Sequence, residues 1–124
     1  MPDTLVSLDQ PAAHRHQRPP PFVCTTDDGY VHVEGEIDIA AAPLLEHALT
    51  VALSRSLAVV LDLHDVSFLD SAGTRAIVLA SVLARARAQP LVLLHGPPNV
   101  DRLFAMTGNA DQVVFFEPII HAAA

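Results

Sequence analysis

The sequence contains no lysine, and its only permanent cations are seven arginines set against fourteen acidic residues. Without a lysine amine, the chain offers neither a P-loop phosphate grip nor Schiff-base chemistry. The formal net charge of −7 has the wrong sign for a protein that binds a phosphate backbone. We therefore expect no nucleic-acid partner.

Cysteine and long apolar runs are also scarce. The single cysteine, Cys24, excludes an internal disulfide and a cysteine-rich zinc cage, and we expect it to pack as a small hydrophobic side chain. Acidic residues and Arg75 interrupt the most apolar region, so no run is long enough to cross a bilayer. The N-terminus lacks the apolar segment of a signal peptide. These absences predict a cytoplasmic protein with no direct membrane insertion.

Residues 1–21 differ from the rest in composition, because they hold five of the ten prolines among mainly polar residues. This composition predicts a flexible Pro-rich tail. Residues 22–124 are long enough for one domain, and the 51% of hydrophobic residues in the chain provides material for its core. The sequence therefore predicts a tail over 1–21 and a single domain over 22–124.

The seven histidines show no spacing typical of a metal site. His14 and His16 lie in the tail without a third ligand. The histidines at positions 32, 47, 64 and 95 are scattered over expected strand ends and a helix. We expect these side chains to be structural or solvated, with no metal or cofactor bound by the chain.

The hydrophobic period changes along the domain in the manner of an α/β fold. Alternation on both sides of Asp28–Gly29 predicts a hairpin that Gly35 ends. Pro43 and helically spaced leucines predict a helix, and two apolar runs around an Ala-rich segment predict a right-handed strand–helix–strand crossover. The expected elements are strands 22–26 and 30–34, helix 44–53, strand 58–63, helix 73–88, strand 90–94, helix 99–107 and strand 113–116.

This order, β-β-α-β-α-β-α-β, predicts a mixed β-sheet with an N-terminal hairpin and helices packed on it. The chemically informative segment is the junction between its third strand and second helix, where Leu69, Asp70, Ser71 and Gly73 follow one another. First-turn N–H groups lack intrahelical acceptors and the helix dipole is positive there, so a phosphate on Ser71 would meet a favourable field. A plain helix cap by Asp70 or Ser71 explains the same residue types, and both interpretations stay open.

A strand–serine–helix junction also occurs in nucleophile elbows, but the first glycine of that motif is missing here. The downstream residues that could complete a triad are Asp101, Asp111, His95 and His121. The domain is small for that architecture. We therefore expect the chain not to be an enzyme.

Three blocks of sequence occur in a fixed order. The first is Gly35–Glu36–Ile37–Asp38 with Ala42–Pro43, the second runs from Leu61–Asp62–Leu63 through Val66 to Phe68–Leu69–Asp70–Ser71–Ala72–Gly73, and the third is 98–103 with Thr107–Gly108. Together they resemble the STAS domain family and, within it, the bacterial anti-sigma-factor antagonists. The resemblance spans residues 22–117 and implies a STAS-like α/β fold.

The resemblance implies a switch in which the unmodified antagonist binds a serine-kinase anti-sigma factor and frees the sigma factor. Ser71 matches the phosphoacceptor whose phosphorylation reverses binding, and Asp38 matches a carboxylate that lies near that serine. The partner kinase supplies ATP and magnesium, and a serine phosphatase resets the serine. The partner-binding residues implied are Asp38, Asp70, Ala72, Gly73, Thr74 and Arg75.

This sequence departs from the family pattern beside the serine. Ala72 stands where many antagonists have a second Ser or Thr, and Thr74 and Arg75 replace the usual Leu and Gly. We expect the bulk and charge of Arg75 to select the partner kinase or to block phosphorylation. An alternative is an accessory STAS subunit of a bacterial lipid-transport ATPase complex, and a third possibility is a stand-alone small-ligand STAS domain.

Overall fold

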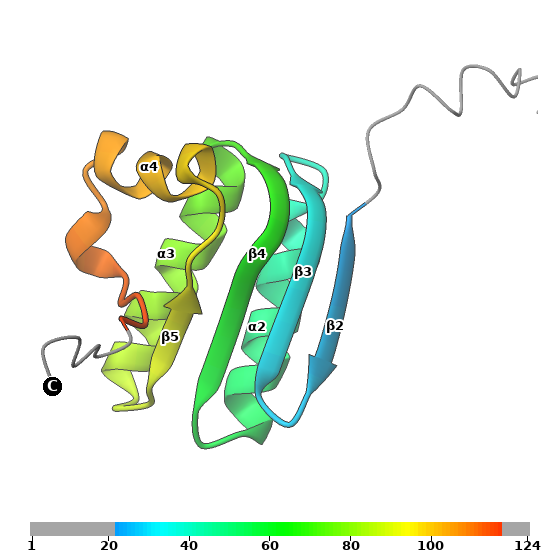
Figure 1. The fold of residues 1–124 in the computed structure, drawn as a ribbon. Coiled ribbons are helices and arrows are strands. Elements are labelled where there is room, and N and C mark those ends of the chain that lie inside the picture. The colour runs from blue at the N-terminus through cyan, green and yellow to red at the C-terminus, as the bar shows by residue number, and fades with distance from the viewer. Residues whose placement is uncertain (1–21, 118–124) are drawn as a thin grey trace, which may run out of the picture.

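The computed structural model describes residues 22–117, and the labels of its elements are those of Figure 1. The strands are β2 (Val23–Asp27), β3 (Tyr30–Ile37), β4 (Val59–Leu69) and β5 (Leu91–Leu94). The helices are α2 (Ala42–Arg55), α3 (Ser71–Ala86) and α4 (Pro98–Met106), followed by the 3-10 turn η1 (Ala110–Gln112). The predicted tail lies outside the described residues.

The four strands form one sheet in the order β2-β3-β4-β5. Only β2 and β3 are antiparallel, and the predicted hairpin between them is confirmed. Asp28 and Gly29 connect these strands with φ angles of +52° and +87°, the positive pair that a tight hairpin turn requires. The pairs β3–β4 and β4–β5 are parallel, because α2 and α3 carry the chain back between them.

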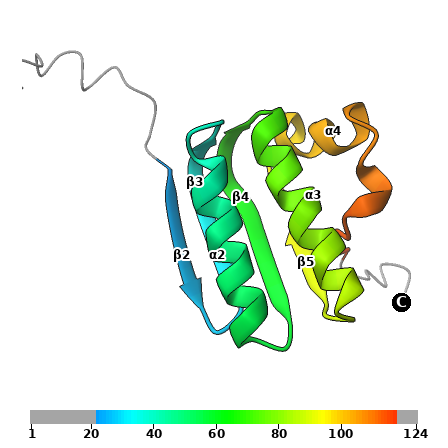
Figure 2. The same cartoon turned by 180° about the vertical axis from the view of Figure 1, so that it is seen from behind.

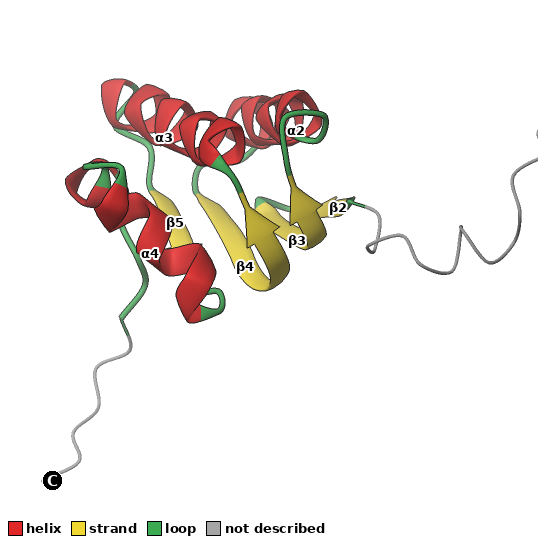
Figure 3. Cartoon of the chain, turned by 90° about the horizontal axis from the view of Figure 1, so that it is seen from above, coloured by secondary structure: helices red, strands yellow, loops and turns green. Residues whose placement is uncertain are grey.

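The helices cover the two faces of the sheet unequally. Helices α2 and α3 lie side by side on one face (Figure 2), whereas α4 lies on the other (Figure 3). Their apolar residues recur at helical spacing: Leu45, Leu49, Ala52 and Leu53 of α2 are buried, as are Ala76, Ile77, Ala80 and Ala84 of α3. No helix within residues 22–117 is long and apolar enough to cross a membrane.

The hydrophobic core between the sheet and helices α2 and α3 contains the strand side chains on that face of the sheet. Val31, Val33 and Ile37 of β3 alternate with more exposed residues, which is the period of a strand with one buried face. Cys24 is partly buried and packs against this core, as predicted, and burial raises the pKa of its thiol.

The predicted last strand, 113–116, is wrong. Within this segment only Phe115 forms a β-bridge, with Leu93 of β5. The two hydrogen bonds of this bridge run from the Leu93 amide to the Val114 carbonyl and from the Phe116 amide to the Leu93 carbonyl, each at 2.8 Å, and β5 itself has four residues. The rings hold the segment instead: Phe115 packs edge-on against Phe104 and stacks on His95 at a centroid distance of 4.3 Å.

The strands β3 and β4 run further than the sequence indicates. Gly35 does not end β3, because it adopts a φ of +96° within the strand, and β3 continues to Ile37. The β3–β4 register shifts once before the pair Glu34–Asp65 and again after the pair Gly35–Val66. The longer β4 absorbs these shifts, so both strands end together at the pair Ile37–Leu69.

Candidate functional site

The candidate site lies where β3 and β4 end at the same edge of the sheet. Ile37 is paired with Leu69, so the residues that follow them, Asp38 and Asp70, leave the sheet as neighbours. The carboxyl edge of parallel strands is where open α/β sheets commonly form binding sites. Two of the predicted residues are therefore brought to this edge by strand register.

Asp70 is the N-cap of α3. Its Oδ1 accepts a hydrogen bond of 2.9 Å from the Gly73 amide, and its carbonyl oxygen accepts from the Thr74 amide and hydroxyl, each at 2.9 Å. The carboxylate satisfies the Gly73 amide, which has no partner inside the helix, and the bond from the Thr74 amide is the first regular bond of α3. Of the two cap interpretations left open by the sequence, the structure selects Asp70.

Ser71 is the first residue of α3 and is exposed. Since Asp70 serves as the cap, the Ser71 hydroxyl has no capping role, and it forms no hydrogen bond with another residue of the 22–117 range. The N-terminal end of a sixteen-residue helix favours negative charge at this position. The hydroxyl is thus accessible and lies in a field that suits a phosphate.

Gly73 allows α3 to begin this close to the sheet. A Cβ on Gly73 would lie 2.5 Å from Leu69 Cδ1, 2.7 Å from Ile37 Cγ2 and 2.9 Å from the Ile37 carbonyl oxygen. No side chain fits at those distances. The glycine therefore allows the first turn of α3 to pack closely against the ends of β3 and β4, and this close packing sets the position of Ser71.

Asp38 organises the turn that leads into α2. Its Oδ1 accepts hydrogen bonds from the amides of Ala40 (3.1 Å) and Ala41 (3.0 Å), and its carbonyl accepts from Ala42 (2.9 Å). Ile39, directly after it, leaves 76% of its surface exposed. Asp38 thus shares the sheet edge with Asp70 while its carboxylate is directed into its own turn.

An open groove of about 440 Å³ begins at Ser71 and follows α3 toward the segment after α4. Arg75 is exposed in it, whereas Thr74 is buried, so Thr74 contributes through packing and its hydroxyl bond. Leu79 provides an exposed apolar side chain one helical turn beyond Arg75. The lining residues are Ser71, Ala72, Thr74, Arg75, Val78, Leu79, Thr107 and Asn109.

The alternative of a nucleophile elbow finds no support in the placement of His95. Both ring nitrogens are bound by carboxylates: Nδ1 lies 2.8 Å from Asp101 Oδ2 and Nε2 lies 2.8 Å from Glu117 Oε2. The hydrogen bond with Glu117, then that with Asp101, raises the pKa of His95 above its usual 6.5. His121 lies outside the described residues.

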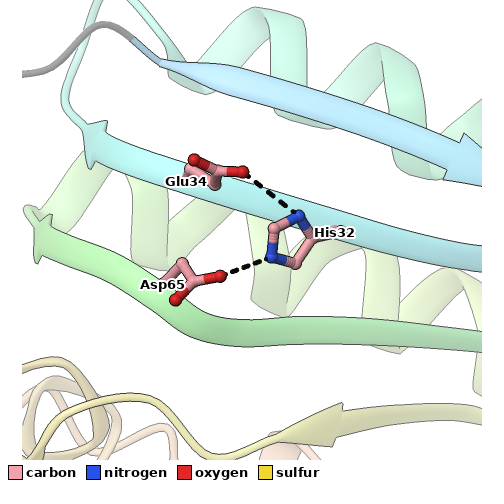
Figure 4. A group of neighbouring side chains, drawn as sticks. All are labelled: His32, Glu34 and Asp65. Carbon is pink, nitrogen blue, oxygen red and sulfur yellow. Dashed lines mark hydrogen bonds and ion pairs between the residues drawn. The ribbon is translucent and has the colours of Figure 1, made fainter.

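The sequence analysis missed a second cluster, formed by His32, Glu34 and Asp65 on β3 and β4 (Figure 4). His32 and Glu34 are two residues apart on a strand, so they share a face, and this spacing could have been noticed. Asp65 joins them only through the β3–β4 register shift, which the sequence does not reveal. His32, expected to be structural or solvated, is therefore one member of a three-residue cluster.

The comparisons with known proteins agree with this architecture. The sequence profile of the STAS domain matches residues 20–122. A protein of Listeria monocytogenes named anti-sigma-B factor antagonist is 37% identical over 87 residues, which cover 69% of this chain and 76% of the relative. A homologue of Listeria innocua with the same name matches equally.

Solved structures resemble the chain over most of its length. The crystal structure of an anti-sigma factor antagonist from Mycobacterium paratuberculosis has a TM-score of 0.64 at 26% identity, covering 80% of this chain and 86% of the other. The antagonist SpoIIAA in its unphosphorylated form gives 0.61 at 20% identity, covering 78% and 89%. The likeness to SpoIIAA concerns the fold, and it confirms the predicted α/β class.

Proposed function

The chain belongs to the STAS domain family, and from this premise we propose that it acts as an anti-sigma-factor antagonist controlled at Ser71. In this proposal the unmodified chain binds an anti-sigma factor that is also a serine kinase, and so frees a sigma factor. Transfer of a phosphoryl group to Ser71 reverses the binding. The observation that carries the proposal is the exposed Ser71 hydroxyl at the first position of α3, with its capping role taken by Asp70.

The partner would contact the sheet edge through the side chains that are accessible there. Ser71, Arg75 and Ile39 are exposed, and Ala72 is partly so. Gly73 and Thr74 are buried, so their proposed role is to hold Ser71 in position. Asp38 and Asp70 shape the two turns that present these residues.

Electrostatics alone can reverse such an interaction. Two unit charges ~6 Å apart at an effective dielectric of ~20 repel by roughly 2.8 kcal/mol before salt screening. A phosphoserine carries up to about two negative charges. Facing one carboxylate of the partner at that distance, it would weaken the complex by about two decades, since ~1.4 kcal/mol is tenfold in affinity.

The carboxylates of Asp38 and Asp70 work against spontaneous loading of phosphate, although the N-terminal end of α3 favours negative charge at Ser71. We propose that the partner kinase brings ATP, magnesium and the basic groups that the transfer needs, and that a separate serine phosphatase removes the phosphate. The chain itself would then bind no cofactor. Arg75, one helical turn from Ser71 on the exposed side of α3, would influence which kinase is accepted.

The experiment uses the tagged full chain to recover its partner from native extract, followed by phosphotransfer from ATP and mapping of the phosphorylated residue. We expect an ATPase with serine-kinase activity and a phosphate on Ser71. Ser54, exposed on α2, provides the control as Ser54→Ala. Recovery of a membrane ATPase that leaves the chain unphosphorylated would refute the proposal in favour of an accessory transport subunit.

A further inference from the structure

The open face of β3 and β4, opposite α2 and α3, carries the three-residue cluster of Figure 4. The imidazole of His32 lies between two carboxylates: Nε2 is 2.8 Å from Asp65 Oδ2, and Nδ1 is 3.7 Å from Glu34 Oε2. One ligand atom from each residue can be chosen so that all three lie within 4.8 Å of one another. An imidazole nitrogen and two carboxylate oxygens are a donor set suited to divalent transition metals.

The register of the sheet builds this cluster. His32 is paired with Asp62, but two residues later Glu34 is paired with Asp65, so β4 contains one extra residue between the pairs. In an unshifted register Glu34 would face His64. The bulge thus places a carboxylate, rather than a second imidazole, beside Glu34, and bulges commonly redirect a side chain in this way.

The charge of the cluster is not balanced by arginine. Within residues 22–117, Glu34 and Asp65 form ion pairs with His32 alone. Two carboxylates against one imidazole leave net negative charge whether or not the ring is protonated. A divalent cation would neutralise that charge, and it would replace the weaker contact of 3.7 Å with a metal–ligand bond.

The distances allow the cluster to close around an ion. Zinc ligands at ~2.1 Å in a tetrahedral site are roughly 3.4 Å apart, so ligand atoms that now lie within 4.8 Å of one another need to approach by up to about 1.4 Å. The side chains of Glu34 and Asp65 are 53% and 51% exposed, which leaves them free to rotate, whereas the backbone positions are fixed by two paired strands.

From this juxtaposition we propose that His32, Glu34 and Asp65 form a binding site for a divalent transition metal that links β3 to β4. Water completes the coordination on the open side. The site is independent of the proposed switch at Ser71, and its ligands come from residues that meet only in the folded sheet. Metal binding therefore stabilises the native state.

The test is calorimetric titration of the full chain, freed of any affinity tag, with zinc chloride at about pH 7.5. We expect one ion per chain, and binding at least ~10-fold weaker in Glu34→Gln and in Asp65→Asn. Glu46→Gln is the matched control, because it removes the same charge from an exposed position on α2. The double variant His14→Gln/His16→Gln excludes the tail and should bind as the unaltered chain does.

Paramagnetic broadening by cobalt locates the bound metal without relying on variants. Paramagnetic Co²⁺ should broaden the amide signals of His32, Glu34 and Asp65 before those of α2, and zinc should raise the melting temperature of the unaltered chain but not of Asp65→Asn. Equal zinc affinity in Asp65→Asn and Glu46→Gln, loss of binding in the tail variant, or broadening centred elsewhere would each overturn the proposal.

Discussion

The starts of α2 and α3 use the same local design, yet only one of them presents a hydroxyl. Each helix follows one of two paired strands, and an aspartate comes directly after each strand. The Oδ1 of each aspartate accepts a hydrogen bond from the amide three residues later, Ala41 or Gly73. At α3 the helix begins at once, with Ser71 in its first turn. At α2 a turn intervenes, and the corresponding position holds the exposed Ile39.

The two helix starts differ because a glycine stands at one of them and an alanine at the other. Gly73 lets the first turn of α3 press against Ile37 and Leu69, so Ser71 lies directly at a helix N-terminus. Ala41 occupies the corresponding position at α2 with its Cβ accommodated. One strand end therefore presents a hydroxyl at a helix N-terminus, and the other presents an exposed apolar side chain.

The largest expected effect is that of Gly73→Ala. The added Cβ meets Leu69 and Ile37 at distances that force a shift, so we expect a loss of roughly 2–3 kcal/mol in the free energy of unfolding, measured by urea denaturation. The reverse exchange at α2, Ala41→Gly, should change this free energy by about 1 kcal/mol or less, because Ala41 is the N-cap of α2, where glycine is accepted. Equal losses would mean that the two helix starts do not differ in packing.

The second expected effect concerns affinity. Ser71→Glu should weaken binding to the recovered kinase at least ~10-fold, because it places a negative charge where the phosphate would lie, whereas Ser71→Ala should bind nearly as the unaltered chain does. Ser54→Glu on α2 controls for an added charge elsewhere. Calorimetric titration against the kinase provides the measurement, and an unchanged affinity for Ser71→Glu would contradict the proposed switch.

A third, smaller effect tests the shared design of the two aspartates. Asp70→Ala should lower the free energy of unfolding by about 1 kcal/mol, and Asp70→Asn should recover most of this loss, because an amide oxygen also accepts the Gly73 amide. The same pair at Asp38 should follow the same order through Ala41. A response at only one of the two positions would break the comparison.

The smallest effect concerns the end of β5, which carries His95 in place of an aspartate. Because Glu117 and Asp101 raise the pKa of His95 in the folded state, their contribution is full below the usual pKa of 6.5 and is lost as pH rises through the folded value. Thermal unfolding of the unaltered chain and His95→Gln should therefore differ more at about pH 6 than at about pH 9. A constant difference would contradict this role.

The sequence predicts much of this architecture because its signals are local. The Asp28–Gly29 turn, the helical spacing in α2 and the junction at Asp70 and Ser71 each lie within one short segment, and the structure has them as expected. The fold class, read from the order of elements, is confirmed as well.

The features that the sequence analysis missed depend on pairing between distant segments. Val113–Phe116 is an apolar run of strand length, but it forms a single bridge with the four-residue β5, and Phe115 packs against the rings of Phe104 and His95. Asp65 reaches His32 through a register shift that no local pattern encodes. The roles of Asp38, Asp70 and Arg75 in partner binding stay predictions.

Phosphotransfer from the recovered kinase to a double variant tests the central claim most directly. In Ser71→Ala/Ile39→Ser the hydroxyl moves to the position after Asp38, where it follows an aspartate but does not begin a helix. We expect one phosphate on Ser71 in the unaltered chain and none in the double variant, by mass spectrometry. Phosphate on the serine at position 39, or undiminished incorporation after loss of Ser71, would contradict the account.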